Sequence, residues 1–209
     1  LPTEALHDFD AAISRDPRYG PALVGKGDAL SCLGDHSEAL KSYSKGANDE
    51  ARLRTAHAQL RLGKLTEARG NAESILSRDP TNMGATHLRG CVLYTEGDLE
   101  TARGAFETVS AAADAHALRA QACYNLGLTC LRLGQHDAAL AAFDACAKSL
   151  QQGSGTGPTP DETVSPSFGR ALVAYAAGDD AMMRDHLGRA RREAPRSAYV
   201  EMFSGVLAS

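Results

Sequence analysis

Small and bulky apolar residues recur along the chain at fixed distances from a set of glycines. We take such a glycine as the origin of each unit. A small residue lies seven positions before the origin, and an alanine usually lies five positions after it. In most units a bulky side chain lies nine positions after the origin. Around Gly134 these positions hold Gly127, Ala139 and Phe143. Apolar positions spaced in this way are typical of amphipathic helices, so the pattern predicts one helix on each side of the glycine.

The pattern occurs five times, and its second half occurs once more near the N-terminus. The origin glycines are Gly34, Gly63, Gly97, Gly134 and Gly178. At each we expect the left-handed backbone conformation that ends a helix without a Cβ clash. Isolated helices of this length are marginal in water, so the pairs must be held by stacking on their neighbours. The sequence therefore predicts a repeat protein.

Two local features refine this prediction. Gly27, Gly90 and Gly127 fall inside predicted helices, where each costs about 1 kcal/mol relative to alanine, so we expect a packing reason for them. The step from Gly34 to Gly63 is only 29 residues, which leaves no room for a turn ending in proline. We therefore expect Asn48 to cap the next helix directly.

The spacing, the small and large positions, and the prolines that end three second helices resemble the tetratricopeptide repeat family over nearly the whole chain. The resemblance implies an all-α fold: a right-handed superhelix (α-solenoid) of about five helix pairs, whose first helices line a concave groove. We expect a single domain over residues 1–209. Its predicted segments are a half-repeat at 3–17, repeats at 20–46, 48–80, 82–111, 114–150 and 164–195, a flexible loop at 151–166 and a lone terminal helix at 197–208.

Composition and charge narrow the function classes. With 43% hydrophobic and 23% charged residues the chain can bury a core, and its net charge of -4 disfavours binding to nucleic acid or anionic membrane. No apolar run is long enough to insert into a membrane. Five cysteines without a CxxC pair indicate reduced thiols that fill a core, and hence an intracellular, cytoplasmic protein. The pattern starts inside a unit, so we expect the chain to be part of a longer protein.

Motifs of catalysis are absent from the sequence. It contains no GxxxxGK[ST], GxGxxG, HExxH or GxSxG, and its seven histidines are dispersed without metal-ligand spacing. We therefore predict no enzyme activity, no cofactor and no metal site, and we expect function to reside in a binding surface.

The resemblance places that surface on the exposed positions of the first helices. Such a groove, with Arg and Tyr among its residues, is suited to an extended peptide or partner helix with apolar anchors and some acidic character. The alternative for its aromatic residues is that they merely pack against neighbouring helices. The groove candidates are Asp28, Leu53, His57, Arg61, His87, Tyr94, Tyr124, Asn125, Leu128, Arg132, Phe168 and Tyr175.

One known mode of binding in the family can be tested directly on the sequence. Members that hold the acidic tails of heat-shock chaperones use a carboxylate clamp, with Lys and Asn, then Asn, then Lys and Arg on three successive first helices. The matching places here hold Val24 and Asp28, then Arg54, then Gly84 and Leu88, and a frame one unit later also fails. Residues 56–106 are similar to repeats of J-domain co-chaperones, but no HPD signature is present. The carboxylate clamp is thus absent, and only the similarity to co-chaperone repeats keeps a chaperone-associated adaptor as an alternative to a general interaction scaffold.

Two further alternatives stay open. The chain could be a structural spacer in a longer array, as in ciliary transport or trafficking complexes, or a targeting module for an enzyme elsewhere in a longer protein. The predicted terminal helix carries apolar residues that we expect to contact a neighbour or a second copy of the chain: Tyr199, Met202, Phe203 and Val206. The predicted loop could be a plain linker or a docking or phosphorylation segment.

Overall fold

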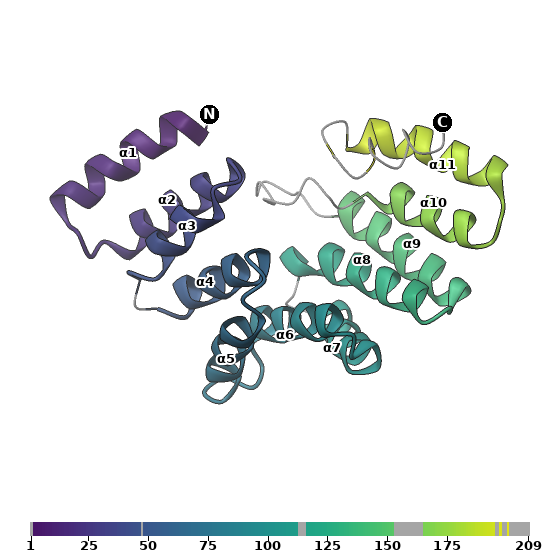
Figure 1. Ribbon diagram of the computed structural model, residues 1–209, viewed down its shortest axis with the longest axis horizontal. Helices are drawn as coiled ribbons and strands as arrows, with labels where there is room; N and C mark the ends of the chain where they lie inside the picture. Colours follow the sequence, from purple (N-terminus) through teal and green to yellow (C-terminus); the bar gives the residue numbers. More distant parts are fainter. Residues whose placement is uncertain are drawn as a thin grey trace. The chain divides into compact units, whose positions relative to one another are not determined.

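The computed structural model describes residues 2–46, 48–112, 116–152 and 165–194, together with residues 197 and 200. These residues form eleven α-helices, and no strand occurs among them (Figure 1). The helices are α1 (Pro2–Arg15), α2 (Gly20–Cys32), α3 (His36–Tyr43), α4 (Asp49–Arg61), α5 (Leu65–Leu76), α6 (Met83–Glu96), α7 (Leu99–Ala111), α8 (His116–Arg132), α9 (His136–Gln152), α10 (Pro166–Ala176) and α11 (Asp180–Glu193).

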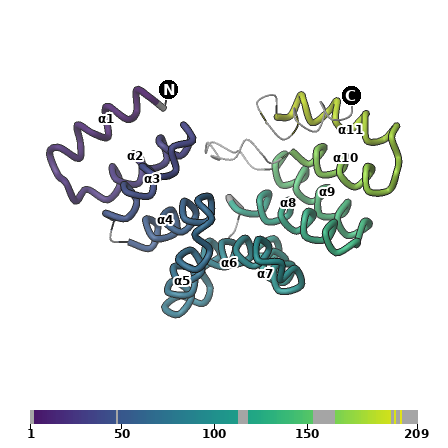
Figure 2. Tube along the Cα trace, in the orientation of Figure 1, coloured from purple at the N-terminus to yellow at the C-terminus, as the bar shows by residue number. Residues whose placement is uncertain are grey.

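The chain divides into two compact units, residues 1–92 and 93–209, which we describe separately. In unit 1 each helix from α1 to α5 packs on the next, and the two first helices α2 and α4 also contact each other. In unit 2 each helix from α7 to α11 likewise packs on the next, and the first helices α8 and α10 are in contact (Figure 2). Each unit is thus a stack of helix pairs with its first helices side by side, as the all-α repeat prediction requires.

The turns inside the pairs are the ones that the sequence predicts. The five origin glycines adopt positive φ, from 73° at Gly63 and Gly134 to 91° at Gly97, and no other described residue does. In three pairs an aspartate follows the glycine and its side chain accepts a hydrogen bond from the third backbone N–H of the next helix. Such caps typically contribute about 1 kcal/mol each.

The short step between the first two glycines is closed by a different cap. Asn48 accepts a hydrogen bond of 2.8 Å from the backbone N–H of Ala51, so α4 begins there without a preceding proline turn. This confirms the cap predicted at Asn48. The cap lets the second pair of unit 1 follow the first after a connection of five residues, 44–48.

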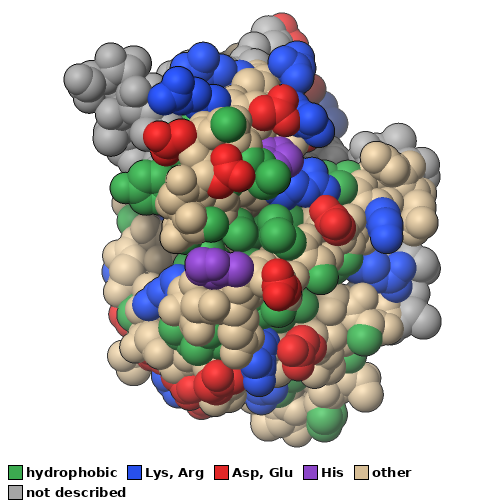
Figure 3. All heavy atoms as spheres, turned by 90° about the vertical axis from the view of Figure 1, so that its right-hand side faces the viewer, with side chains coloured by type: hydrophobic (Ala, Val, Ile, Leu, Met, Phe, Trp, Pro, Cys, Tyr) green, Lys and Arg blue, Asp and Glu red, His purple; other side chains and the backbone are tan. Residues whose placement is uncertain are grey.

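Surface charge is mixed rather than gathered by sign over the face drawn in Figure 3. Lys and Arg side chains alternate there with Asp and Glu, and apolar side chains lie between them. Among the described residues no helix combines the length and apolar character needed to cross a membrane.

The glycines inside first helices receive the aromatic side chains of second helices. A Cβ at Gly127 would lie 2.5 Å from Cε1 of Phe143, and one at Gly27 would lie 2.3 Å from Cε1 of Tyr43. Phe143 is completely buried and Tyr43 nearly so. The rings thus occupy the space that a side chain would need, which is the packing reason expected for these two glycines.

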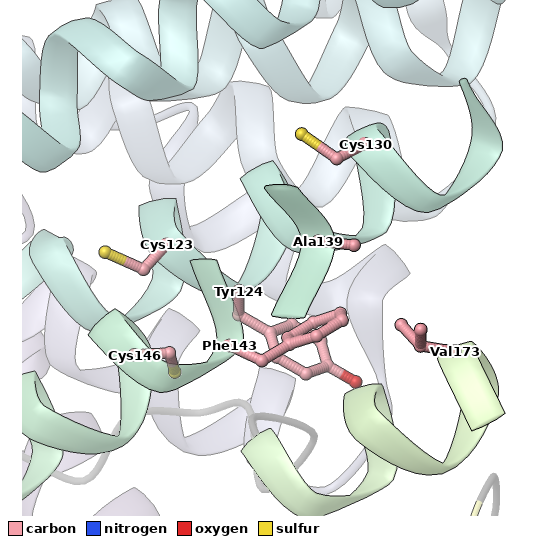
Figure 4. Close-up of a cluster of buried hydrophobic side chains, with 7 residues drawn as sticks. All are labelled: Cys123, Tyr124, Cys130, Ala139, Phe143, Cys146 and Val173. Atoms are coloured by element: carbon pink, nitrogen blue, oxygen red, sulfur yellow. The ribbon is translucent and has the colours of Figure 1, made fainter. Parts of the chain in front are cut away.

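The core of unit 2 centres on Phe143. Its ring lies 5.5 Å, centroid to centroid, from that of Tyr124, and three buried cysteines belong to the same cluster (Figure 4). Burial raises the pKa of the Cys146 thiol to about 12, so this thiol stays protonated and apolar. All five cysteines are free, and Cys123, Cys130 and Cys146 fill the core as predicted, whereas Cys32 is exposed.

The last helix pair is joined at its base by a carboxylate. Glu193, at the end of α11, accepts hydrogen bonds from the hydroxyls of Ser165 (2.6 Å) and Ser167 and from the Ser167 backbone N–H (3.2 Å). Burial raises the pKa of Glu193, but these hydrogen bonds outweigh it and the pKa is lowered overall. The ionised carboxylate therefore holds the start of α10 against the end of α11.

The predicted loop and terminal helix are only partly within the described residues. α9 extends to Gln152 and α10 begins at Pro166, so helical residues occupy both ends of the segment predicted as loop at 151–166. Residues 153–164 lie outside the described part. Of the predicted terminal helix, Ser197 and Val200 are described and both are buried. Tyr199, Met202, Phe203 and Val206 lie outside the described residues.

Candidate interaction surface

A stripe of accessible side chains runs along the first helix α8 of unit 2. Gln121, Asn125, Leu128 and Arg132 are spaced four, three and four residues apart, which places them on one line of the helix. Arg132 is exposed and the other three are partly buried, while most of the residues that flank the stripe are buried. The flanks are buried because α8 packs on α7, α9 and α10.

The next first helix, α10, carries a second stripe of apolar character. Phe168, Leu172 and Tyr175 are four and three residues apart and so share one line of α10. Phe168 and Leu172 are partly buried, and Tyr175, in the last turn, is 58% exposed. Because α10 contacts α8, the two stripes belong to neighbouring helices of one unit.

Arg132 is held in place by the end of α6. Its guanidinium carbon lies 4.6 Å above the centroid of the Tyr94 ring, and its Nη1 donates a hydrogen bond of 2.9 Å to the Tyr94 carbonyl oxygen. The cation over the ring is worth about 0.5–1 kcal/mol at an exposed site. The second contact adds to the hydrogen bond of 3.3 Å that the same carbonyl accepts from the Gly97 backbone N–H. We call the two stripes together with Tyr94 the first-helix surface of unit 2.

The corresponding surface of unit 1 is dominated by paired charges. Asp28 on α2 accepts a hydrogen bond of 2.7 Å from the Tyr43 hydroxyl and lies 3.1 Å from Nε of Arg54 on α4. Burial, followed by this bond to Asp28, raises the pKa of Tyr43 well above its ordinary value. Arg54 also approaches Glu50 at 3.8 Å. Asp28 therefore joins α2, α3 and α4.

The remaining candidates of unit 1 lie on α4 and α6. Leu53 is partly buried against the cluster of small and aliphatic residues between α4, α5 and α6, and Arg61 is exposed. The rings of His57 and His87 are 6.4 Å apart, centroid to centroid. The structure therefore brings His57 of α4 beside α6, while His87 itself is only 4% exposed.

Two of the candidates belong to the interior. Tyr124 is 7% exposed, burial raises the pKa of its phenol, and its ring packs on Phe143. His87 is buried to a similar extent. For Tyr124 the alternative named from the sequence, packing against neighbouring helices, describes its position. His87 was predicted only as a groove residue, and its burial is a correction to that prediction. They are left out of the surface proposed below.

Sequence reasoning missed a contact at His87. The Cys91 sulfur lies 3.9 Å from Nδ1 of His87, one helical turn away, so a histidine and a thiol are at ligand-type spacing after all. The pattern HxxxC in α6 was the available signal. No group of three or more metal-type side chains is found among the described residues.

Comparison with known proteins identifies the class. A profile of the family described as tetratricopeptide repeat matches residues 2–52, 53–114 and 87–154. The chain belongs to the tetratricopeptide repeat family, and its helix pairs form an α-solenoid fold of that family. Repeats of this kind are protein-interaction modules, so the chain is a protein-interaction scaffold. No curated protein matches it in sequence at a significant level.

Solved structures share this fold. A chain of the APC/C hetero-tetramer Cut9–Hcn1 aligns with a TM-score of 0.75 and 21% identity, over 96% of this chain and 38% of that chain. TTC0263, a tetratricopeptide repeat protein of Thermus thermophilus, aligns with a TM-score of 0.72 and 18% identity, over 91% and 100%. PilW, a type IV pilus biogenesis factor, aligns with a TM-score of 0.70 and 16% identity, over 97% and 90%. The chain thus spans well under half of the first of these proteins.

Proposed function

We propose that the first-helix surface of unit 2 binds a peptide segment of a partner protein, extended or helical, through apolar anchors. The observation that carries this proposal is the stripe of Phe168, Leu172 and Tyr175, which ends in an aromatic side chain that is 58% exposed. Tyrosine is among the residue types that contribute most to binding energy at interfaces.

The neighbouring α8 stripe supplies polar groups beside the apolar anchors. Gln121 and Asn125 carry side-chain amides, which can pair with the backbone groups of a bound peptide. Arg132 uses one N–H on the Tyr94 carbonyl, and a guanidinium has five N–H donors. The remaining donors suit an acidic side chain of the ligand.

Unit 1 is less suited to this role. Its central charged residues already neutralise one another, with Arg54 between Asp28 and Glu50. A ligand would have to compete with those ion pairs and with the Tyr43 hydrogen bond. The corresponding region of unit 2 holds Leu128, Leu172 and Tyr175, which offer apolar area to a ligand.

The test begins with a library of random dodecapeptides displayed on phage and selected against the whole chain. Affinities of the enriched peptides are then measured by fluorescence anisotropy for wild type, Tyr175→Ala and the control Tyr19→Ala. Tyr19 is also exposed, at 48%, but lies in the turn before α2 in unit 1. We expect Tyr175→Ala to weaken binding about tenfold or more, as for an interface anchor, and Tyr19→Ala to leave it unchanged.

Two results would contradict the proposal. One is an equal affinity of the wild type and Tyr175→Ala for every enriched peptide, with both variants folded by circular dichroism. The other is the absence of any enriched peptide, which would favour the structural spacer that the sequence left open. The coarser conclusion, that the chain is an interaction scaffold, does not depend on this result.

A further inference from the structure

The outer face of α11 carries arginines without partners. Arg184, Arg191 and Arg192 are exposed, and none of them forms an ion pair with any residue of the described ranges. The fourth arginine of the helix, Arg189, is paired with Asp185 at 2.7 Å. These three unpaired residues lie within one helix of a chain whose net charge is -4.

Most other arginines of the described chain are tied to a partner. Arg54 and Arg103 each contact two acidic side chains, Arg170 is bound to Asp144 at 2.6 Å, and Arg132 is bound to Tyr94. The exposed arginines that lack a partner outside α11 are Arg15, Arg18 and Arg89. Arg15 lies at the end of α1, Arg18 in the turn that follows, and Arg89 on α6.

The acidic residues of the last helix pair do not neutralise this face. Glu193 is engaged by Ser165 and Ser167, and Asp179 caps the backbone of Met182. Asp180, one turn before Arg184, forms no ion pair with it in the described structure. The helix dipole favours Arg191 and Arg192 in the last turn, but it does not account for Arg184, which lies two turns earlier.

Helical geometry sets the shape of this patch. Arg191 and Arg192 follow Arg184 by seven and eight residues, so the three lie within an arc of about 100° of the helix circumference. Over eight residues the helix rises about 12 Å. In an extended chain, alternate side chains point the same way and are about 7 Å apart, so a segment with three acidic side chains at alternate positions spans about 14 Å. It is long enough to reach from Arg184 to the adjacent pair Arg191 and Arg192.

We propose that the outer face of α11, formed by Arg184, Arg191 and Arg192, is a second binding surface that takes an extended acidic segment of a partner protein with carboxylates at alternate positions. This surface lies on a second helix of its pair and is separate from the peptide site proposed on the first helices. Arginine pairs with carboxylates through two parallel hydrogen bonds, so each contact is charge-assisted and directional. Three arginines over about 12 Å can pair with only about three phosphates, which favours a short acidic segment over a nucleic acid or an anionic membrane as occupant.

The experiment uses the whole chain and a fluorescein-labelled peptide of twelve residues in which Glu and Ser alternate, with a Gln/Ser peptide as the neutral control. Binding is measured by fluorescence anisotropy for wild type, for Arg184→Ala/Arg191→Ala/Arg192→Ala, and for the matched control Arg15→Ala/Arg18→Ala/Arg89→Ala. Both triple variants remove three unpaired exposed charges. We expect the α11 variant to weaken binding at least tenfold and the control variant to change it less than twofold.

Further measurements distinguish specific binding by the arginines from a general effect of charge or a loss of folding. A triple Lys variant at the three α11 positions keeps the charge but cannot form two parallel hydrogen bonds to one carboxylate, so it should bind more weakly than wild type and more tightly than the triple Ala variant. Circular dichroism should report unchanged helicity for all variants. The proposal is overturned if both triple Ala variants weaken binding equally, if the Lys variant binds no better than the Ala variant, or if the Gln/Ser peptide binds as well. It is also overturned if a uridine dodecanucleotide or phosphatidylserine vesicles bind the α11 face as tightly as the acidic peptide.

Discussion

Replacing Gly127 by alanine tests whether the recurring small residue of the first helices exists to receive an aromatic ring. A Cβ at this position would lie 2.5 to 2.8 Å from three atoms of the Phe143 ring. The ring has no room to withdraw, because a Cβ at Gly169 on α10 would lie 2.3 Å from the same edge. Phe143 is thus held between glycines of two first helices, and it has no solvent-accessible surface.

Two opposing effects determine how much Gly127→Ala changes the free energy of unfolding. Alanine gains about 1 kcal/mol over glycine in a helix interior. Against this, ordinary contacts between carbon atoms are about 3.5–4.0 Å, so the ring or the helix must shift by roughly 1 Å. Overpacking of this kind typically costs about 1–3 kcal/mol, and the upper part of that range applies where the neighbour is confined. We expect Gly127→Ala to be destabilising by about 1–2 kcal/mol in net terms.

Gly104 provides the matched control. It lies in the middle of α7 in the same unit, and a Cβ there would meet nothing within 4 Å. Gly104→Ala should therefore stabilise the protein by about 0.5–1 kcal/mol. Urea unfolding followed by circular dichroism should separate the two variants by roughly 1 M in midpoint. Equal stabilisation by both substitutions would refute the reasoning, since it would show that the ring does not need the space.

Three further predictions concern the turns, the thiols and the last helix pair. Gly63→Ala should lower stability by about 1 kcal/mol in urea unfolding, because alanine is strained at a φ of 73°, although no atom obstructs its side chain. At pH 8 a disulfide reagent should modify exposed Cys32 rapidly and buried Cys146 only on unfolding, and fast reaction of Cys146 would contradict its raised pKa. Glu193→Gln should lower the thermal midpoint at pH 7 by an amount equivalent to about 1–2 kcal/mol. Folding lowers the pKa of Glu193, so the stability difference between wild type and this variant should be fully present above the ordinary pKa of 4.5. The difference should disappear as the pH falls through the pKa of the folded state.

The parts of the fold that could be predicted from sequence are those set by local backbone chemistry. A glycine after an apolar run predicts a left-handed turn because any other residue would be strained there, and Gly34, Gly97 and Gly178 have this conformation. Asn48 was recognisable as a cap because the short spacing left no residues for another kind of turn. These features depend on residues a few positions apart, so the sequence contains them directly.

The candidate surface was less predictable, because a first helix is buried on both flanks. Helical spacing alone made Tyr124 and Leu128 equally good candidates for the groove. In the structure Tyr124 packs in the core beside Phe143, whereas Leu128 lies on the accessible stripe. The difference depends on how closely α8 packs against α9, which single-sequence periodicity does not contain. Contacts between distant residues were equally out of reach, as with Arg132 and Tyr94, which are 38 positions apart.

Arg132 shows how holding neighbouring helices together and binding a ligand can depend on the same residue in a repeat fold. It joins the ends of α6 and α8 through the Tyr94 ring and carbonyl, so replacing it removes a structural contact as well as any ligand contact. A loss of binding in an Arg132 variant would therefore not by itself locate the ligand. Tyr175 and the three arginines of α11 are better probes, because their side chains are exposed and neither set forms the contact between α6 and α8 that Arg132 makes. Independent effects of these two sets on two different ligands would show that unit 2 has two binding surfaces.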